Sequence, residues 1–212
     1  MGEMKLIPRE AWGARPPNGG YTPRTLDNRG TVHYSASGIT PTGRSGTRSA
    51  PEKPGAKWYR IWRNKATPAL QRRKISRMIS EYNKSLKALG GGAFVMQSVR
   101  DQEKAIMRGF QAFHQGPSRG WVDIAYHHVC FASGNVYEGR PIGVMGAHAY
   151  GANDTLGFCF VMTDGDKMTS FMKSSFNAMA KVDGVTAWKG HRQRPGNSTS
   201  CPGDAVMREL NL

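Results

Sequence analysis

Two histidines and one cysteine are the side chains of this sequence best suited to bind a metal. His33 lies in the stretch TVHYSAS, and His191 and Cys201 lie together in GHRQRPGNSTSCPG. Two imidazoles and one thiolate suit Zn²⁺ in a tetrahedral arrangement and leave a fourth position open, as in catalytic zinc sites. The sequence therefore predicts a zinc hydrolase. The competing interpretation is chance, because the chain has six histidines in 212 residues and isolated His-Cys pairs are common.

The segments around these residues predict an α/β fold. A short β-type run over Thr31–Tyr34 carries His33 near its end, and a short strand near 185–188 leads to His191. We further expect a helix over about 101–114 with Ile106, Phe110 and Phe113 on one face, a hairpin turning at 133–135, a strand over 156–162, a helix over 168–182 and a last helix after Pro202-Gly203. Strands that alternate with helices indicate a central sheet flanked by helices.

Residues 57–87 are the most basic part of the chain, with ten Lys and Arg side chains and one acidic residue, Glu81. Hydrophobic residues from Ile75 to Leu89 follow the period of a helix that stops at a run of three glycines. The simpler interpretation is a helix with a solvated basic back. The alternative is an element that binds an anionic wall or membrane surface. Residues 36–56 are rich in Gly, Ser, Thr and Pro and predict a long loop.

The formal net charge of +15 predicts attraction to polyanions that weakens with salt. Because no nucleic-acid-binding motif accompanies this charge, we expect no specific nucleic-acid partner. The N-terminal stretch MGEMKLIPREAWGARPP lacks the apolar core of a secretory signal, so we expect synthesis in the cytoplasm. Cys130 and Cys159 lie in apolar, strand-like runs, which favours reduced core thiols over a disulfide.

Five motifs occur in order along the chain: IPREAWGARPP, VHYSAS, GWVDIAYHHVCFASGNVYEGRP, GAHAYGANDTLGFCFV and GH-x9-CPG. Together they resemble the zinc-dependent N-acetylmuramoyl-L-alanine amidases of the amidase-2 and peptidoglycan recognition protein superfamily. The resemblance covers about residues 6–35 and 101–212, so it implies a single catalytic domain over 1–212 with a basic helical insertion at about 36–99. It also implies a central mixed β-sheet flanked by helices and a groove for a glycan with its stem peptide.

The resemblance also assigns site residues. It implies that His33, His191 and Cys201 bind one catalytic Zn²⁺, and that Tyr126 and Thr199 are catalytic positions. Four further residues match substrate-binding positions of the groove: His127, Arg140, His148 and Asn153. We expect His127 to face the substrate and His128 to replace a core Phe, whereas Arg140 could instead pair with Glu138 or Asp123. Gln193 stands where the family has an acid near the metal, and the interval between His191 and Cys201 is longer than in compact members.

The reaction implied is hydrolysis of the amide between N-acetylmuramic acid and L-alanine in peptidoglycan. Hydroxyl groups of Tyr126 and Thr199 would stabilise water or the developing negative charge. The general acid is left open among metal-bound water, Tyr126 and His127. We expect a monomeric phage endolysin that waits in the host cytoplasm, acts on the wall after membrane permeabilisation, and binds anionic wall polymers or a membrane surface through the insertion. The alternatives are a bacterial wall-recycling amidase and a non-catalytic peptidoglycan-binding module.

Overall fold

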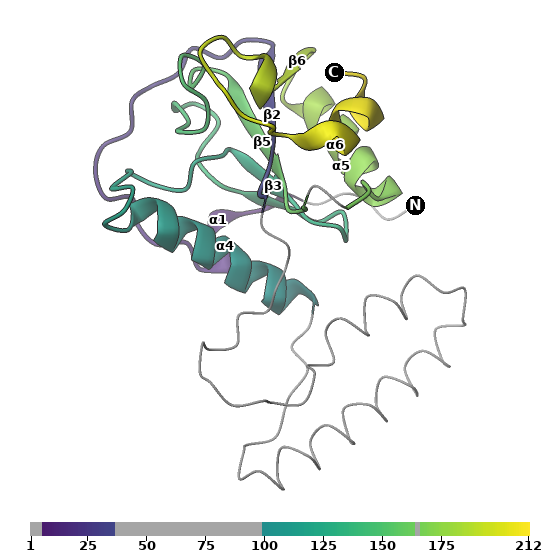
Figure 1. Cartoon of the computed structure of the whole chain (residues 1–212). Coiled ribbons are helices and arrows are strands. Elements are labelled where there is room, and N and C mark those ends of the chain that lie inside the picture. Colours follow the sequence, from purple (N-terminus) through teal and green to yellow (C-terminus); the bar gives the residue numbers. More distant parts are fainter. Residues whose placement is uncertain (1–5, 37–98, 164–165) are drawn as a thin grey trace, which may run out of the picture. The chain divides into compact units, whose positions relative to one another are not determined.

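The computed structural model describes residues 6–36, 99–163 and 166–212. Within these residues six strands form one sheet in the order β1-β4-β3-β5-β2-β6. Figure 1 labels four of them, β3, β5, β2 and β6. The strands are β1 (Leu6–Ile7), β2 (Arg29–Tyr34), β3 (His128–Cys130), β4 (Val136–Glu138), β5 (Leu156–Phe160) and β6 (Ala187–Gly190). The hairpin of β3 and β4 is antiparallel, and every other neighbouring pair is parallel. The sheet is therefore mixed, as the sequence predicts.

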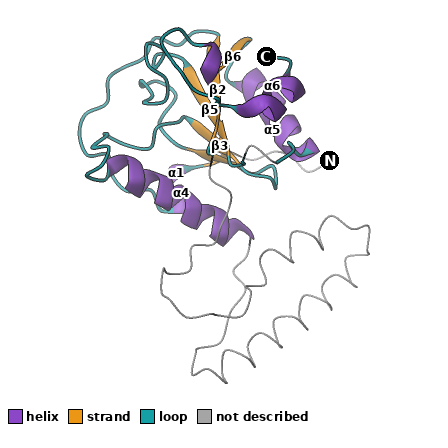
Figure 2. Cartoon of the chain, in the orientation of Figure 1, coloured by secondary structure: helices purple, strands orange, loops and turns teal. Residues whose placement is uncertain are grey.

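Helices lie on both faces of this sheet (Figure 2). The helices are α1 (Arg9–Trp12) and α4 (Val99–Gln115) on one face, and α5 (Ser170–Val182) and α6 (Gly203–Leu210) on the other. The short 3₁₀ helix η1 (His191–Gln193) follows β6 directly. The predicted fold class, a central mixed sheet flanked by helices, is confirmed.

The alternation of side chains along β5 separates two hydrophobic cores. Phe158 and Phe160 belong to the core that α5 and α6 complete, whereas Cys159 belongs to the core that α1 and α4 complete. This is the period of two that a strand imposes on its side chains. Cys130 and Cys159 are fully buried and belong to different cores, on opposite faces of the sheet, so their side chains pack as core residues and do not face each other.

Most predicted elements within the described residues occur with shifts of one or two residues. The helix face of Ile106, Phe110 and Phe113 is only partly buried, since Phe113 is 53% exposed; the buried positions of α4 include Met107, Gln111 and His114. Gln111 can be buried because its amide donates to Asp123 Oδ1 and to a backbone carbonyl. The buried face of α4 therefore includes a polar residue, which a search for apolar periodicity does not find. The sequence interpretation also missed β1 and α1.

The predicted insertion at about 36–99, with its basic helix, lies almost entirely outside the described residues. The organisation of 1–212 as a single domain with that insertion therefore stays a prediction. Among the helices that the structure describes, none combines the length and the apolar character needed to cross a membrane.

Candidate metal centre

The structure brings together the three residues predicted to bind a metal. One ligand atom from each of His33, His191 and Cys201 lies within 4.8 Å of the other two. The Sγ atom of Cys201 lies 3.7 Å from His33 Nδ1. In a tetrahedral site with Zn–N of about 2.0 Å and Zn–S of about 2.3 Å, nitrogen and sulfur ligands lie about 3.5 Å apart. These residues therefore fit Zn²⁺ with little rearrangement.

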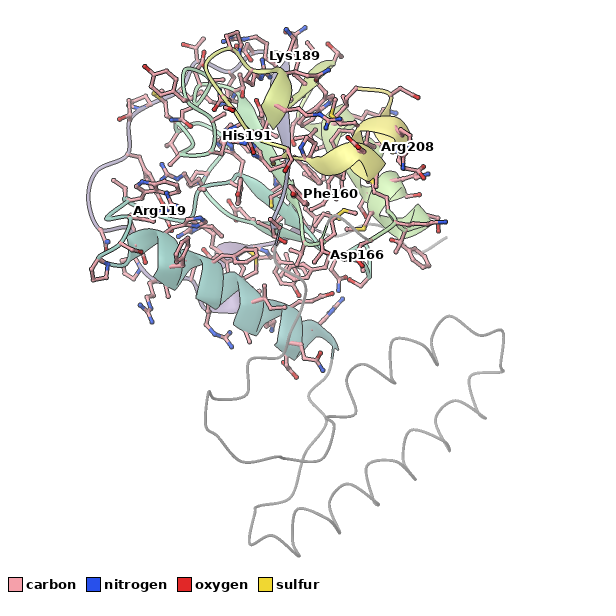
Figure 3. All side chains as sticks on the ribbon, in the orientation of Figure 1. Arg119, Phe160, Asp166, Lys189, His191 and Arg208 are labelled. Carbon is pink, nitrogen blue, oxygen red and sulfur yellow. The ribbon has the colours of Figure 1, made fainter. Side chains whose placement is uncertain are left out.

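Three different local structures supply the three candidate ligands. His33 lies in β2, where it pairs in register with Cys159 and is 1% exposed. His191 is the first residue of η1, directly after β6, and is partly exposed (Figure 3). Cys201 is buried two residues before α6. Both histidines stand at the carboxyl ends of their strands. Because β2 and β6 are parallel neighbours, these two ends lie at the same edge of the sheet.

A chain of hydrogen bonds fixes the tautomer of His33. His148 Nε2 lies 3.1 Å from the carbonyl oxygen of Thr155, which only accepts, so this nitrogen of His148 carries the proton. His148 Nδ1 then accepts the bond from His33 Nε2 at 3.0 Å. The remaining ring nitrogen of His33, Nδ1, keeps its lone pair and faces Cys201 Sγ. This is the nitrogen that a metal requires.

Burial keeps the imidazoles of the centre neutral. It lowers the pKa of His33 and His148 well below 6.5, and the neighbouring imidazoles lower both further. Burial also lowers the pKa of His191, whose Nε2 lies 2.9 Å from Asn197 Oδ1. The amide N–H of Tyr34 points at Cys201 Sγ at 3.4 Å, a contact that favours the thiolate. The neutral imidazoles therefore keep lone pairs with which they can bind a metal cation.

Two predicted catalytic hydroxyl groups lie beside the ligands. The ring of Tyr126 stands 5.1 Å from the ring of His33. Burial, and then the neighbouring thiols of Cys159 and Cys201, raise the pKa of Tyr126 well above 10, so its hydroxyl is a donor at neutral pH. Thr199 is exposed, and its Oγ1 accepts the amide N–H of Cys201 at 3.1 Å, which leaves the hydroxyl hydrogen able to donate.

His127 does not face a substrate. It is fully buried, its Nδ1 accepts the N–H of Gly157 at 2.8 Å, and its Nε2 donates to the carbonyl of Val144 at 2.9 Å. Burial lowers its pKa to about 3. We therefore reassign His127 to holding β5 in place. His128 is also buried, as expected, but it bonds to Asp183 at 2.8 Å in addition to packing on Phe158, so it is more than a substitute for Phe.

The guanidinium of Arg140 is also turned inward. It donates to the carbonyl oxygens of Ile124, Met145 and Asp123, at 2.6, 2.8 and 3.2 Å. Side-chain pairing with Glu138 or Asp123 is therefore replaced by three backbone bonds. At 6% exposure Arg140 stabilises the loops around the site and does not reach outward as a substrate-binding residue would.

Asn153 and His148 likewise support the site from within. Asn153 Oδ1 accepts the backbone N–H groups of His148 and Ala149, at 2.7 and 3.0 Å. His148 is buried against His33. The substrate-binding assignments of these two residues find no support in this geometry, because their polar atoms bond within the protein.

Sequence reasoning missed an aromatic and cationic surface beside the centre, which we call the Trp121 surface: Phe113, Arg119 and Trp121, which lie over the buried ring of His114. The rings of His114 and Trp121 stack at 5.0 Å, and Arg119 lies over the rings of both Trp121 and Phe113. His114 in turn stands 6.0 Å from the ring of Tyr126. Burial lowers the pKa of His114 to about 4. The run FHQGPSRGW was the available signal, because it places these four residues within nine positions.

Comparison with known proteins identifies the homologues of the chain. No protein-family model matches it. Peptidoglycan-recognition protein SC2 of Drosophila simulans is 36% identical over 117 residues, which are 49% of this chain and 60% of that protein. Peptidoglycan-recognition protein LB of Drosophila melanogaster is 33% identical over 117 residues, 50% of this chain and 48% of that protein. The matches thus span about three fifths or less of these relatives' length.

Solved structures show the same fold. Bumblebee PGRP-SA superposes with a TM-score of 0.64 at 16% identity, over 98% of this chain and 94% of that one. Peptidoglycan recognition protein LE, solved in complex with tracheal cytotoxin, a monomeric diaminopimelic acid-type peptidoglycan, gives 0.62 at 21% identity, over 97% and 92%. The relatives matched in sequence are therefore peptidoglycan-recognition proteins, and the chain shares the fold of the solved structures of such proteins.

Proposed function

We propose that this protein is a zinc-dependent N-acetylmuramoyl-L-alanine amidase that cleaves the amide joining the glycan of peptidoglycan to its stem peptide. The observation that carries the proposal is the His33–His191–Cys201 cluster, with His33 Nδ1 turned towards the thiol at 3.7 Å. A ligand set of two imidazoles and one thiolate leaves a position open for chemistry. The names of the homologues support peptidoglycan as the ligand.

The residues of the chain divide the work of such a reaction. His33, His191 and Cys201 would hold Zn²⁺, which when bound supplies a Lewis acid that polarises an amide carbonyl and makes water more acidic. Tyr126 keeps its proton at neutral pH and can donate a hydrogen bond to the charge developing on the carbonyl oxygen. Thr199 offers a second, exposed donor. Because His127 is enclosed, Tyr126 is the remaining side chain among the proposed donors for the leaving amine.

In this proposal the Trp121 surface contacts the substrate. Aromatic faces pack against the apolar faces of sugars and alkyl chains, and Arg119 supplies a cation that suits a peptide carboxylate. We also infer that the basic residues 57–87 hold the protein on anionic wall polymers or a membrane surface. In this proposal the enzyme is a monomer of the endolysin type, made in a host cytoplasm and active on the wall after permeabilisation.

Purified protein incubated with sacculi tests the proposal. We expect free stem peptides beginning with L-alanine, detected by mass spectrometry, loss of the product with chelator, and its return with Zn²⁺. Replacing Tyr126 with Phe removes the donor and keeps the ring, so the rate should fall by ~10²- to 10³-fold with Zn²⁺ affinity unchanged. Binding of sacculi without product in any metal state would instead favour a recognition module. Product from small muropeptides but not from sacculi would favour a wall-recycling enzyme.

A further inference from the structure

The partly exposed ligand His191 depends on one contact for its orientation. It follows β6 at the start of η1, and its Nε2 lies 2.9 Å from Asn197 Oδ1. Gln193, which stands where an acid was expected, does not fill this role, because its Oε1 accepts the N–H of Gly190 at 2.7 Å. The support for His191 therefore comes from within the long interval that separates it from Cys201.

The surroundings of Asn197 settle which end of its amide faces His191. Asn197 Nδ2 lies near three backbone carbonyls, those of Tyr150, Pro195 and Arg194, at 2.9, 3.0 and 3.3 Å. Its Oδ1 accepts the N–H of Tyr150 at 3.0 Å. A reversed amide would place oxygen against three acceptors, so the oxygen must face His191. Because this oxygen only accepts, His191 Nε2 carries the proton and Nδ1 keeps the lone pair for a metal.

The same amide joins both histidine ligands to one loop. Asn197 bonds to the N–H and the carbonyl of Tyr150, and three residues later Asn153 holds the N–H of His148. His148 fixes the tautomer of His33. The loop over 148–153 thus contacts the supports of His33 and of His191. A change in this loop would reach both ligands.

We propose that Asn197 is the positioning residue of the metal centre: it holds His191 in the Nε2–H tautomer, which leaves the lone pair on Nδ1, and it anchors His191 to the loop that also supports His33. This inference rests on the metal binding of the proposed function but not on amide cleavage. Partners of this kind typically change metal affinity by ~10- to 100-fold when they are removed.

The test replaces Asn197 with Ala, with Ser198→Ala as an exposed control in the same segment. Long-range ¹H–¹⁵N correlation spectra of the zinc-free protein near neutral pH report the tautomer of His191, assigned by comparison with His191→Gln. We expect the Nε2–H form in the parent and in Ser198→Ala, and a mixture of tautomers in Asn197→Ala. Zinc affinity, measured by competition with a chromogenic chelator, should fall ~10- to 100-fold in Asn197→Ala alone.

A second measurement separates orientation from folding. Denaturant unfolding in chelator should show one cooperative transition for both Asn197→Ala and Ser198→Ala, so that the lower zinc affinity of Asn197→Ala reports the orientation of His191 in a folded protein. The proposal is overturned if folded Asn197→Ala keeps a single Nε2–H tautomer, or if it binds zinc as tightly as Ser198→Ala does. Failure of the amidase assay with these results intact would instead refute only the proposed reaction.

Discussion

The two histidines of the candidate metal centre lie close together but are held in different ways. His33 lies inside the sheet at 1% exposure, and its partner His148 is bonded in turn to a backbone carbonyl. His191 stands on a short 3₁₀ helix at the surface of the sheet's carboxyl edge, and a single side-chain amide orients it. The orientation of His33 is thus a property of the folded core, whereas that of His191 is a property of a loop.

Because of this difference, substitutions around the two histidines should differ in their effect on the free energy of unfolding, although both should lower zinc affinity. Removal of a buried, hydrogen-bonded group leaves a cavity and unpaired polar atoms, while removal of a partly exposed group leaves its partners to water. Substitutions on the His33 side should therefore destabilise the protein as well as the centre. Substitutions on the His191 side should damage the centre alone.

The largest contrast is expected from replacing each ligand with Ala. His33→Ala and His191→Ala should both abolish tight zinc binding, since each removes one of three ligands. His33→Ala should also lower the free energy of unfolding of the zinc-free protein by about 2–4 kcal/mol, because it opens a cavity and leaves His148 Nδ1 without its donor. His191→Ala should cost less than about 1 kcal/mol. Denaturant unfolding in chelator measures both, and equal costs would refute the contrast.

A smaller effect is expected when the His33 support is disturbed indirectly. Gly157 of β5 lies beneath the ring of His148, and a Cβ at this position would stand 2.5 Å from His148 Cδ2. Gly157→Ala should displace His148 and lower zinc affinity by ~10- to 100-fold. It should also destabilise the zinc-free protein by about 1–3 kcal/mol.

Gly109→Ala in α4 is the matched control, because an added Cβ there meets nothing within 4 Å. It should stabilise the protein by about 0.5–1 kcal/mol through the helix propensity of Ala, with zinc affinity unchanged. Chelator competition and denaturant unfolding of the two variants provide the comparison. If Gly157→Ala binds zinc as Gly109→Ala does, the position of His148 does not matter to the centre.

The sequence singled out the three residues that the structure brings together, but not the residues that support them, for a physical reason. His33, His191 and Cys201 are recognisable because few residue types bind zinc and because they lie within motifs that resemble those of a known superfamily. The supports are polar residues whose partners are set by the fold: His148 meets His33 across 115 positions of sequence. A histidine or an amide can bind substrate, pack in the core or orient a metal ligand, and only its neighbours in the fold distinguish these roles.

The same reasoning explains the errors and the successes within the fold. Strands and helices with clear periodicity, such as β5 and α5, were predicted almost to their ends, because local pattern determines them. Arg140 and His127 look like surface residues in the sequence, yet each is buried by bonds to backbone carbonyls that no periodicity reveals. Polar residues that hydrogen-bond to backbone carbonyls of loops are therefore the least predictable part of the site.

Low pH should lower the free energy of unfolding, because the buried imidazoles take up protons only when the protein unfolds. Burial lowers the folded-state pKa of His127 to about 3, below the ordinary value of 6.5, so between these values the unfolded chain binds a proton that the folded chain does not. Stability therefore falls as pH falls through this window, by ~1.4 kcal/mol per pH unit for each such imidazole. His33 and His148 shift in the same direction.

His127→Gln isolates one of these contributions. In zinc-free protein, the plot of unfolding free energy against pH should be shallower for this variant by ~1.4 kcal/mol per pH unit below about pH 6. Denaturant titrations at a series of pH values supply the slopes. Parallel slopes for the variant and the parent would mean that His127 takes up its proton while the protein is still folded.

The smallest effect is expected where the two supports meet. Asn153 acts on His33 through the backbone of His148, two contacts from the metal ligand, whereas Asn197 touches His191 directly. Asn153→Ala should cost about 0.5–1.5 kcal/mol of stability for the lost hydrogen bonds. It should lower zinc affinity less than Asn197→Ala, because the bond from His148 to Thr155 still holds the ring. Chelator competition on both variants ranks them, and a larger loss of affinity in Asn153→Ala would show that the loop over 148–153, and not the direct contact to each ligand, governs the centre.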